Sequence, residues 1–145
     1  MKKLFLLVLV PAVILSCDVR RKDKIADDAA ARAEQALKDS TTVQVIDTSY
    51  NFGKVTEGEK VEYNFRFKNI GKKPLVIIKT TASCGCTVPE KPEQPILPGE
   101  AGFIKVVFNS KHKMGHNEKT ITVTSNANPP FPPLLLIGEV EEAKE

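Results

Sequence analysis

A strict alternation of apolar and polar side chains over residues 61–68 is the feature that most constrains the fold of this chain. Val61, Tyr63, Phe65 and Phe67 occupy every second position, and charged or amide residues fill the positions between them. Side chains two residues apart lie on the same face of an extended strand. The segment therefore predicts a strand with one buried face and one solvated face.

Shorter runs rich in β-branched or aromatic residues follow the same pattern, and Gly, Pro and Asn clusters separate them. We predict about seven strands, at 42–46, 50–55, 61–68, 75–78, 104–108, 120–124 and 134–140. Strands that are half buried on one face need a second sheet to cover the apolar side. The sequence therefore predicts an all-β, two-sheet sandwich over residues 43–140, followed by an acidic tail at 141–145.

Two proline-rich segments lie inside this region. One has a proline at every third position, namely Pro89, Pro92, Pro95 and Pro98. This spacing is typical of polyproline II, and we interpret the segment as the connection that crosses between the sheets, with a partner-binding proline face as the alternative. The other, at 128–133, suits a cis peptide bond in a tight corner, where Phe131 is either a buried plug or an exposed contact.

The first sixteen residues predict export. Lys2 and Lys3 precede an apolar run over residues 4–15 that is too short to cross a hydrocarbon core of about 30 Å as a helix. The run ends in Ile14-Leu15-Ser16-Cys17, which resembles the bacterial lipobox. We therefore expect a signal peptide at 1–16 and lipid on the thiol and amine of Cys17, which would attach the chain to a membrane. An ordinary signal peptide cut elsewhere, with Cys17 an incidental thiol, is the alternative.

A charged segment separates Cys17 from the first predicted strand. Residues 18–42 hold six basic and six acidic residues, and their Ala-rich part over 26–37 has high helix propensity but only a thin apolar stripe. We interpret residues 17–42 as the lipidated cysteine and a spacer, helical in part, that lifts the domain off the bilayer. A helix that docks a partner is the alternative.

Charge and motif content exclude several classes of function. The net charge of +3 falls to +1 when the two lysines of the signal peptide are removed (3 − 2), so no strongly basic field attracts nucleic acid. We find no glycine-rich phosphate loop and no Ser-His-Asp arrangement, and we expect neither enzymatic activity nor a cofactor. The expected partners are the membrane, through lipid on Cys17, and another envelope protein.

Cys84-Gly85-Cys86 is the most chemically distinctive segment. Thiols at positions i and i+2 project from the same face of an extended chain, and Gly85 permits a turn. Three interpretations remain open. The pair is a structural or idle disulfide in an oxidising compartment, a redox-active dithiol, or a thiolate site for a soft metal such as Cu(I) or Zn(II).

A metal site would need further ligands, and the candidates are His112, Met114 and His116. Imidazole and thioether groups suit copper. If the strand that begins near residue 75 runs antiparallel to one that begins near 118, the cysteines lie close to the 110–117 loop. A solvated loop in which these side chains are incidental is the alternative.

Five segments in combination resemble a known bacterial lipoprotein family, DUF1573, a domain of unknown function. They are Phe65-Arg66-Phe67-Lys68-Asn69-Ile70-Gly71, Pro74-Leu75-Val76-Ile77, Ser83-Cys84-Gly85-Cys86-Thr87, Leu97-Pro98-Gly99-Glu100 and Lys119-Thr120-Ile121-Thr122-Val123-Thr124-Ser125-Asn126. The resemblance covers residues 43–140 and implies an immunoglobulin-like sandwich similar to major sperm protein and ASH domains, which are non-enzymatic interaction modules. It assigns no activity, and it does not extend to the 112–116 segment.

These observations predict a membrane-anchored lipoprotein of the bacterial cell envelope, facing the periplasm or the cell surface. Its immunoglobulin-like domain would bind a partner without catalysis. The alternative is a periplasmic thiol-redox or soft-metal module built on the Cys-Gly-Cys pair.

Overall fold

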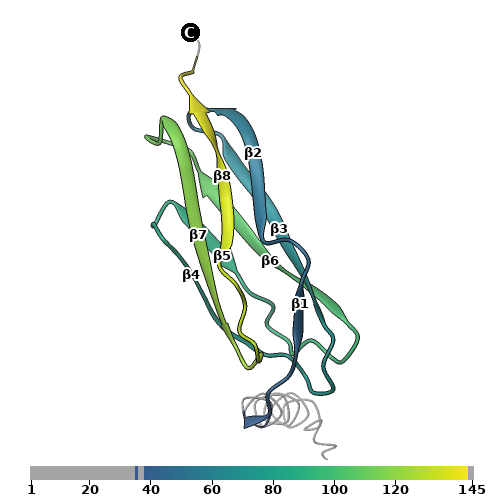
Figure 1. Ribbon diagram of the computed structural model, residues 1–145. Helices are drawn as coiled ribbons and strands as arrows, with labels where there is room; N and C mark the ends of the chain where they lie inside the picture. Colours follow the sequence, from purple (N-terminus) through teal and green to yellow (C-terminus); the bar gives the residue numbers. More distant parts are fainter. Residues whose placement is uncertain (1–34, 36–37, 144–145) are drawn as a thin grey trace, which may run out of the picture.

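The computed structural model describes residue 35 and residues 38–143, and its strands form two sheets packed face to face (Figure 1). The first sheet has the order β1-β3-β6-β5, with β1 Val43–Val45, β3 Lys60–Asn69, β6 Ala101–Asn109 and β5 Thr87–Glu90. The second has the order β2-β8-β7-β4, with β2 Ser49–Thr56, β8 Leu134–Glu141, β7 Gly115–Ser125 and β4 Ile77–Ala82. The predicted all-β sandwich is confirmed.

The apolar faces of both sheets meet in one core. On β3 the alternation places Phe65 and Phe67 inside, each 1% exposed, and the polar residues between them face solvent. The remaining buried apolar side chains come mainly from β6, β7 and β8, and they are Ile104, Val106, Phe108, Ile121, Val123, Leu134, Leu136 and Val140. The buried face is thus the face that the period-two pattern selects.

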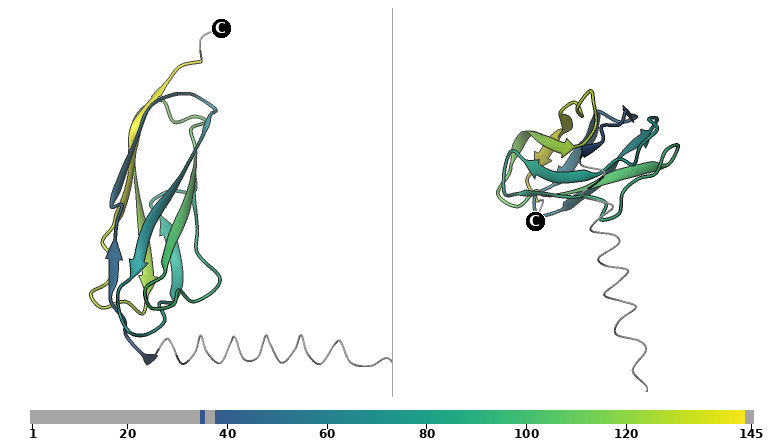
Figure 2. Two further views of the ribbon diagram at one scale, coloured as in Figure 1. Left: turned by 90° about the vertical axis from the view of Figure 1, so that its right-hand side faces the viewer. Right: turned by 90° about the horizontal axis from the view of Figure 1, so that it is seen from below.

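The chain passes from the first sheet to the second between β1 and β2. β1 pairs antiparallel with β3 in the first sheet, and after a short link β2 pairs parallel with β8 in the second. The domain is elongated, and the start of β1 and the end of β8 lie toward its opposite ends (Figure 2). Residues 1–16, Cys17 and most of the predicted spacer lie outside the described residues.

The proline-rich segment differs from its prediction. Pro89 belongs to β5, an eighth strand that the sequence did not indicate, and Val88 and Pro89 lie opposite Val107 and Val106 of β6. Because β5 and β6 are neighbours in one sheet, the prolines after β5 do not cross between sheets, and the predicted crossing there is wrong. The chain crosses earlier, between β4 and β5. A proline is tolerated in β5 because β5 is an edge strand.

Strand β4 also starts later and extends further than predicted. Leu75 instead exchanges two backbone hydrogen bonds with Ile96, at 2.8 and 2.9 Å, and β4 continues through threonines as far as Ala82. Pairing with β7 supports this extension, since β-branched threonines fit a pleated surface without a long apolar alternation.

The corner at 128–133 matches its prediction. The Asn128–Pro129 peptide bond is cis. Phe131 is 8% exposed and its ring packs edge-on against Phe67 at 5.3 Å between centroids, so it is a buried plug.

Candidate functional site

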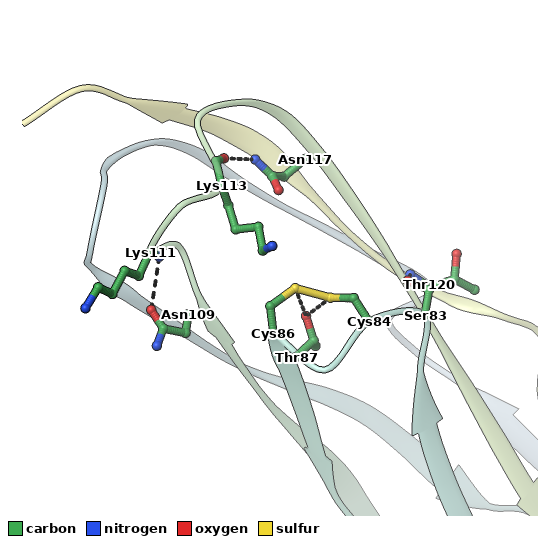
Figure 3. The surroundings of a disulfide bond; sticks show 9 residues. All are labelled: Ser83, Cys84, Cys86, Thr87, Asn109, Lys111, Lys113, Asn117 and Thr120. Carbon is green, nitrogen blue, oxygen red and sulfur yellow. Dashed lines mark hydrogen bonds between the residues drawn. A yellow bond between two sulfur atoms is a disulfide. The ribbon is translucent and has the colours of Figure 1, made fainter.

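The turn between β4 and β5 carries the two cysteines as a disulfide (Figure 3). Cys84 and Cys86 are joined at an S–S distance of 2.05 Å, and both are half-buried. This turn is also where the chain passes from the second sheet to the first. The structure thus joins the pair as a disulfide, which is the covalent state in the first of the three interpretations, at the turn where the chain crosses between the sheets.

Backbone hydrogen bonds fasten both sides of the turn. The Ser83 N–H donates to the Thr120 carbonyl at 2.9 Å, and the Thr120 N–H donates to Ser83 Oγ at 3.1 Å. On the other side, the Asn109 N–H donates to the Cys86 carbonyl at 2.9 Å. The turn is thus tied to β7 and to the end of β6, and the predicted antiparallel pairing that brings it to this edge is confirmed.

A buried hydroxyl lies directly beneath the disulfide. Thr87 is 4% exposed, and its Oγ1 lies 3.6 Å from Cys84 Sγ and 3.9 Å from Cys86 Sγ. A disulfide sulfur carries no proton, so the hydroxyl is the donor in both contacts. The same hydroxyl is placed to donate to a thiolate formed when the S–S bond opens.

The loop between β6 and β7 contributes a cation. The side chain of Lys113 extends from this loop toward the disulfide (Figure 3). Its backbone is held on both sides, because its N–H donates to the Ser110 carbonyl at 3.0 Å and its carbonyl accepts from Asn117 Nδ2 at 2.6 Å. Asn117 is 4% exposed and bonds the Gly115 carbonyl as well, so a buried amide fixes the loop that presents the lysine.

The candidate metal ligands of the same loop do not join the cysteines. His112 Nδ1 lies 3.3 Å from Glu57 Oε1, while His116 Nδ1 lies 3.9 Å from Glu139 Oε2, and both imidazoles are largely exposed. Met114 is 62% exposed. Within residue 35 and residues 38–143, no three His, Cys, Asp or Glu side chains are grouped closely enough to hold a metal ion.

Sequence reasoning missed Thr87, Asn109 and Lys113 as neighbours of the cysteines. Thr87 had a local signal, because it directly follows the Cys-Gly-Cys segment. Asn109 had none, since it lies more than twenty residues away and reaches the turn through the pairing of β5 with β6. Lys113 lies in the 110–117 loop, which the sequence predicts to be close to the cysteines, but only the structure shows that this lysine is directed toward them.

A second surface of interest is the outer side of the first sheet at its β5 edge. We call it the outer β5–β6 face, and it comprises Val88, Glu90, Phe103, Lys105 and Val107. Val88 is 56% exposed and Phe103 is 52% exposed. Phe103 and Lys105 also line a groove that continues along Pro92 and Ile96. Phe103 is thus exposed beside a groove, and Val88 is exposed further along the same face.

No helix in the part of the chain that the structure describes is long and apolar enough to cross a membrane.

The sheet order and the passage of the chain between the sheets after β1 define the class of the domain, an immunoglobulin-like β-sandwich. PapD-like domain 7 of human CEP192 is similar, with a TM-score of 0.55 and 15% identity over 72% of this chain and 89% of that domain. A protein of unknown function from Porphyromonas gingivalis W83 gives a TM-score of 0.61 at 16% identity, over 69% of this chain and 47% of that protein. This chain thus spans about half the length of the Porphyromonas protein.

The secreted serine protease VesC from Vibrio cholerae is also similar, with a TM-score of 0.52 and 11% identity over 83% of this chain but 26% of the protease. At such identities the likeness shows the fold alone.

The family follows from the sequence match. The family model described as a protein of unknown function (DUF1573) matches residues 43–140, so this chain belongs to that family, and the predicted resemblance is confirmed. No curated protein sequence is significantly similar to this chain.

Proposed function

We propose that this chain is a lipid-anchored protein of the bacterial cell envelope whose sandwich binds another envelope protein without catalysing a reaction. The observation that carries the proposal is the outer β5–β6 face, where Val88 and Phe103 remain more than half exposed on a rigid sheet. Burying such side chains against a partner stabilises the complex by about 25 cal/mol per Å² of apolar area. The likeness to an ASH domain supports an interaction role.

The anchor rests on Cys17 and its lipobox. We expect Cys17→Ser to prevent acylation and to release the protein from membranes washed at high salt, because lipid chains supply the attachment. A variant in which both Cys84 and Cys86 are replaced by Ser is the matched control and should remain with the membranes. If the Cys17→Ser protein still sediments with membranes at high salt, the anchor is elsewhere.

Partner binding is tested by placing a photo-crosslinking amino acid on the sandwich in living cells. At position 103 we expect one discrete adduct, and Val88→Lys should abolish it while leaving the circular dichroism spectrum unchanged. Position 122 is the control, since Thr122 is exposed on the other sheet. Equal adducts at 103 and 122, or no adduct at 103, would contradict an interaction through the outer β5–β6 face.

Thiol–disulfide exchange at the Cys84–Cys86 turn is a second candidate function. One observation favours it, since the disulfide is half-exposed in a turn, with a hydroxyl in contact and a lysine side chain directed toward it. The soft-metal alternative has less support, because His112 and His116 are paired with carboxylates elsewhere on the surface.

A further inference from the structure

The two sulfurs of the disulfide have different surroundings. Cys86 directly precedes β5. Its side chain packs against the hydrophobic core, and its carbonyl accepts a hydrogen bond from the Asn109 N–H at the end of β6. Cys84 lies in the turn itself and is not among the residues packed on that core. An incoming thiolate therefore meets less obstruction at Cys84, and Cys86 is the sulfur that the fold holds in place.

The surroundings of Cys86 also suit a leaving thiolate. Thr87 follows it on β5, and its buried hydroxyl lies 3.9 Å from Cys86 Sγ and 3.6 Å from Cys84 Sγ. The hydroxyl therefore reaches both sulfurs and can donate to Cys86 once Cys84 is held in a mixed disulfide. Lys113 approaches from the facing loop and supplies a positive charge (Figure 3). A cation and a hydrogen-bond donor lower the pKa of a thiol, and a leaving thiol of lower pKa departs faster.

A purely structural role accounts poorly for this disulfide. It encloses a single residue between the two cysteines, so the cross-link restricts the unfolded chain very little. The turn is already fastened to β6 and β7 by backbone hydrogen bonds that do not involve the sulfurs.

We infer that the Cys84–Cys86 disulfide exchanges with a dithiol protein, in a fixed direction that starts at Cys84. A thiolate of the partner attacks Cys84 Sγ, the S–S bond breaks, and Cys86 leaves as a thiolate beside Thr87 and Lys113. The partner's second thiol then attacks the mixed disulfide and releases Cys84. This chain gains two electrons and two protons as two thiols, and the partner dithiol is oxidised to a disulfide. The inference rests on the second candidate function.

The direction of attack is tested with reduced glutathione on the exported chain carrying Cys17→Ser, which leaves no other thiol. The reaction is quenched rapidly with acid, free thiols are alkylated, and peptides are sequenced by mass spectrometry. We expect glutathione on Cys84 and the alkyl group on Cys86. Glutathione mainly on Cys86 would overturn the direction while leaving exchange itself intact. A disulfide that reacts only under unfolding conditions would overturn exchange altogether, and with it the second candidate function.

The roles of the two neighbours are tested with Thr87→Val and Lys113→Gln. Each should slow reduction by glutathione about tenfold, the effect of losing one charge-assisted contact worth about 1.4 kcal/mol. With Cys84→Ser added, so that Cys86 is the remaining thiol, ultraviolet thiolate absorbance should show a raised pKa for Cys86 in each test variant, which a merely structural role would not produce. Thr122→Val and Lys72→Gln are the matched controls and should behave as the parent protein. Unchanged rates and thiol pKa in both test variants would refute the assigned roles.

Discussion

Asn69, at the end of β3, offers the sharpest test of how the loops at the entry end of the sandwich are held. Its side chain is 0% exposed and makes four hydrogen bonds. Nδ2 donates to the carbonyls of Lys73 and Ile96 at 2.8 and 2.9 Å, and Oδ1 accepts from Thr41 Oγ1 at 3.0 Å and from the Gly71 N–H at 3.1 Å. One amide therefore joins three separate segments.

We expect Asn69→Ala to lower the free energy of unfolding by about 3 kcal/mol. Losing four hydrogen bonds worth about 1 kcal/mol each sets the upper limit of this decrease in unfolding free energy. Two partners keep another bond, because the Gly71 N–H also donates to Thr42 and the Ile96 carbonyl also accepts from Leu75, which reduces the loss. A deficit of this size is a large share of the roughly 5 to 15 kcal/mol that stabilises a typical domain.

The measurement is urea unfolding followed by far-ultraviolet circular dichroism, since the chain has no tryptophan to report by fluorescence. Asn64→Ala is the matched control, because Asn64 is exposed on the same strand, and it should change stability by less than about 0.5 kcal/mol. If Asn69→Ala costs no more than the control, the buried amide does not organise these loops and the reasoning fails.

Three further predictions concern other sites. Replacing both cysteines of the disulfide by serine should lower the free energy of unfolding by no more than about 2 kcal/mol, and a larger loss in urea unfolding would show a structural staple. Gly138→Ala should cost about 1 to 3 kcal/mol, because the new Cβ would lie 2.3 Å from the ring of Phe52; unchanged stability in the same assay would contradict this close packing. The hydrogen bond from Arg66 holds the pKa of Asp47 below its ordinary 3.8, so the pair stabilises the fold above that pH and loses its effect as pH falls. The stability difference between the parent and Arg66→Gln should therefore shrink on acidification below about pH 4, and a difference constant down to about pH 2 would contradict the pairing.

The sequence by itself determined the fold class and the residues of the core. Alternation on β3 selected Phe65 and Phe67 for the interior, because the pleat of a strand sends successive side chains to opposite faces whatever the strand pairs with. The same local logic singled out Cys84 and Cys86 as a pair, since thiols two residues apart on one face can meet, but it left a disulfide, a redox dithiol and a metal site open, and the structure shows the disulfide. The lipid anchor at Cys17 remains a prediction of the same kind, read from a local pattern.

Only the tertiary structure decided which segments become neighbours. Strand β5 has little alternation of its own and exists because β6 offers it an edge, so the Cys-Gly-Cys turn rather than the prolines makes the crossing between sheets. The same pairing brings Asn109 to the turn. The 110–117 loop lies close to the cysteines, as the sequence predicts, but it directs Lys113 toward the disulfide, while His112 and His116 lie beside carboxylates instead. Such contacts join residues far apart in the chain, and they form because burying both sheets against one core outweighs the entropy of ordering the loops between them. This balance between core burial and loop entropy cannot be predicted from a local sequence pattern.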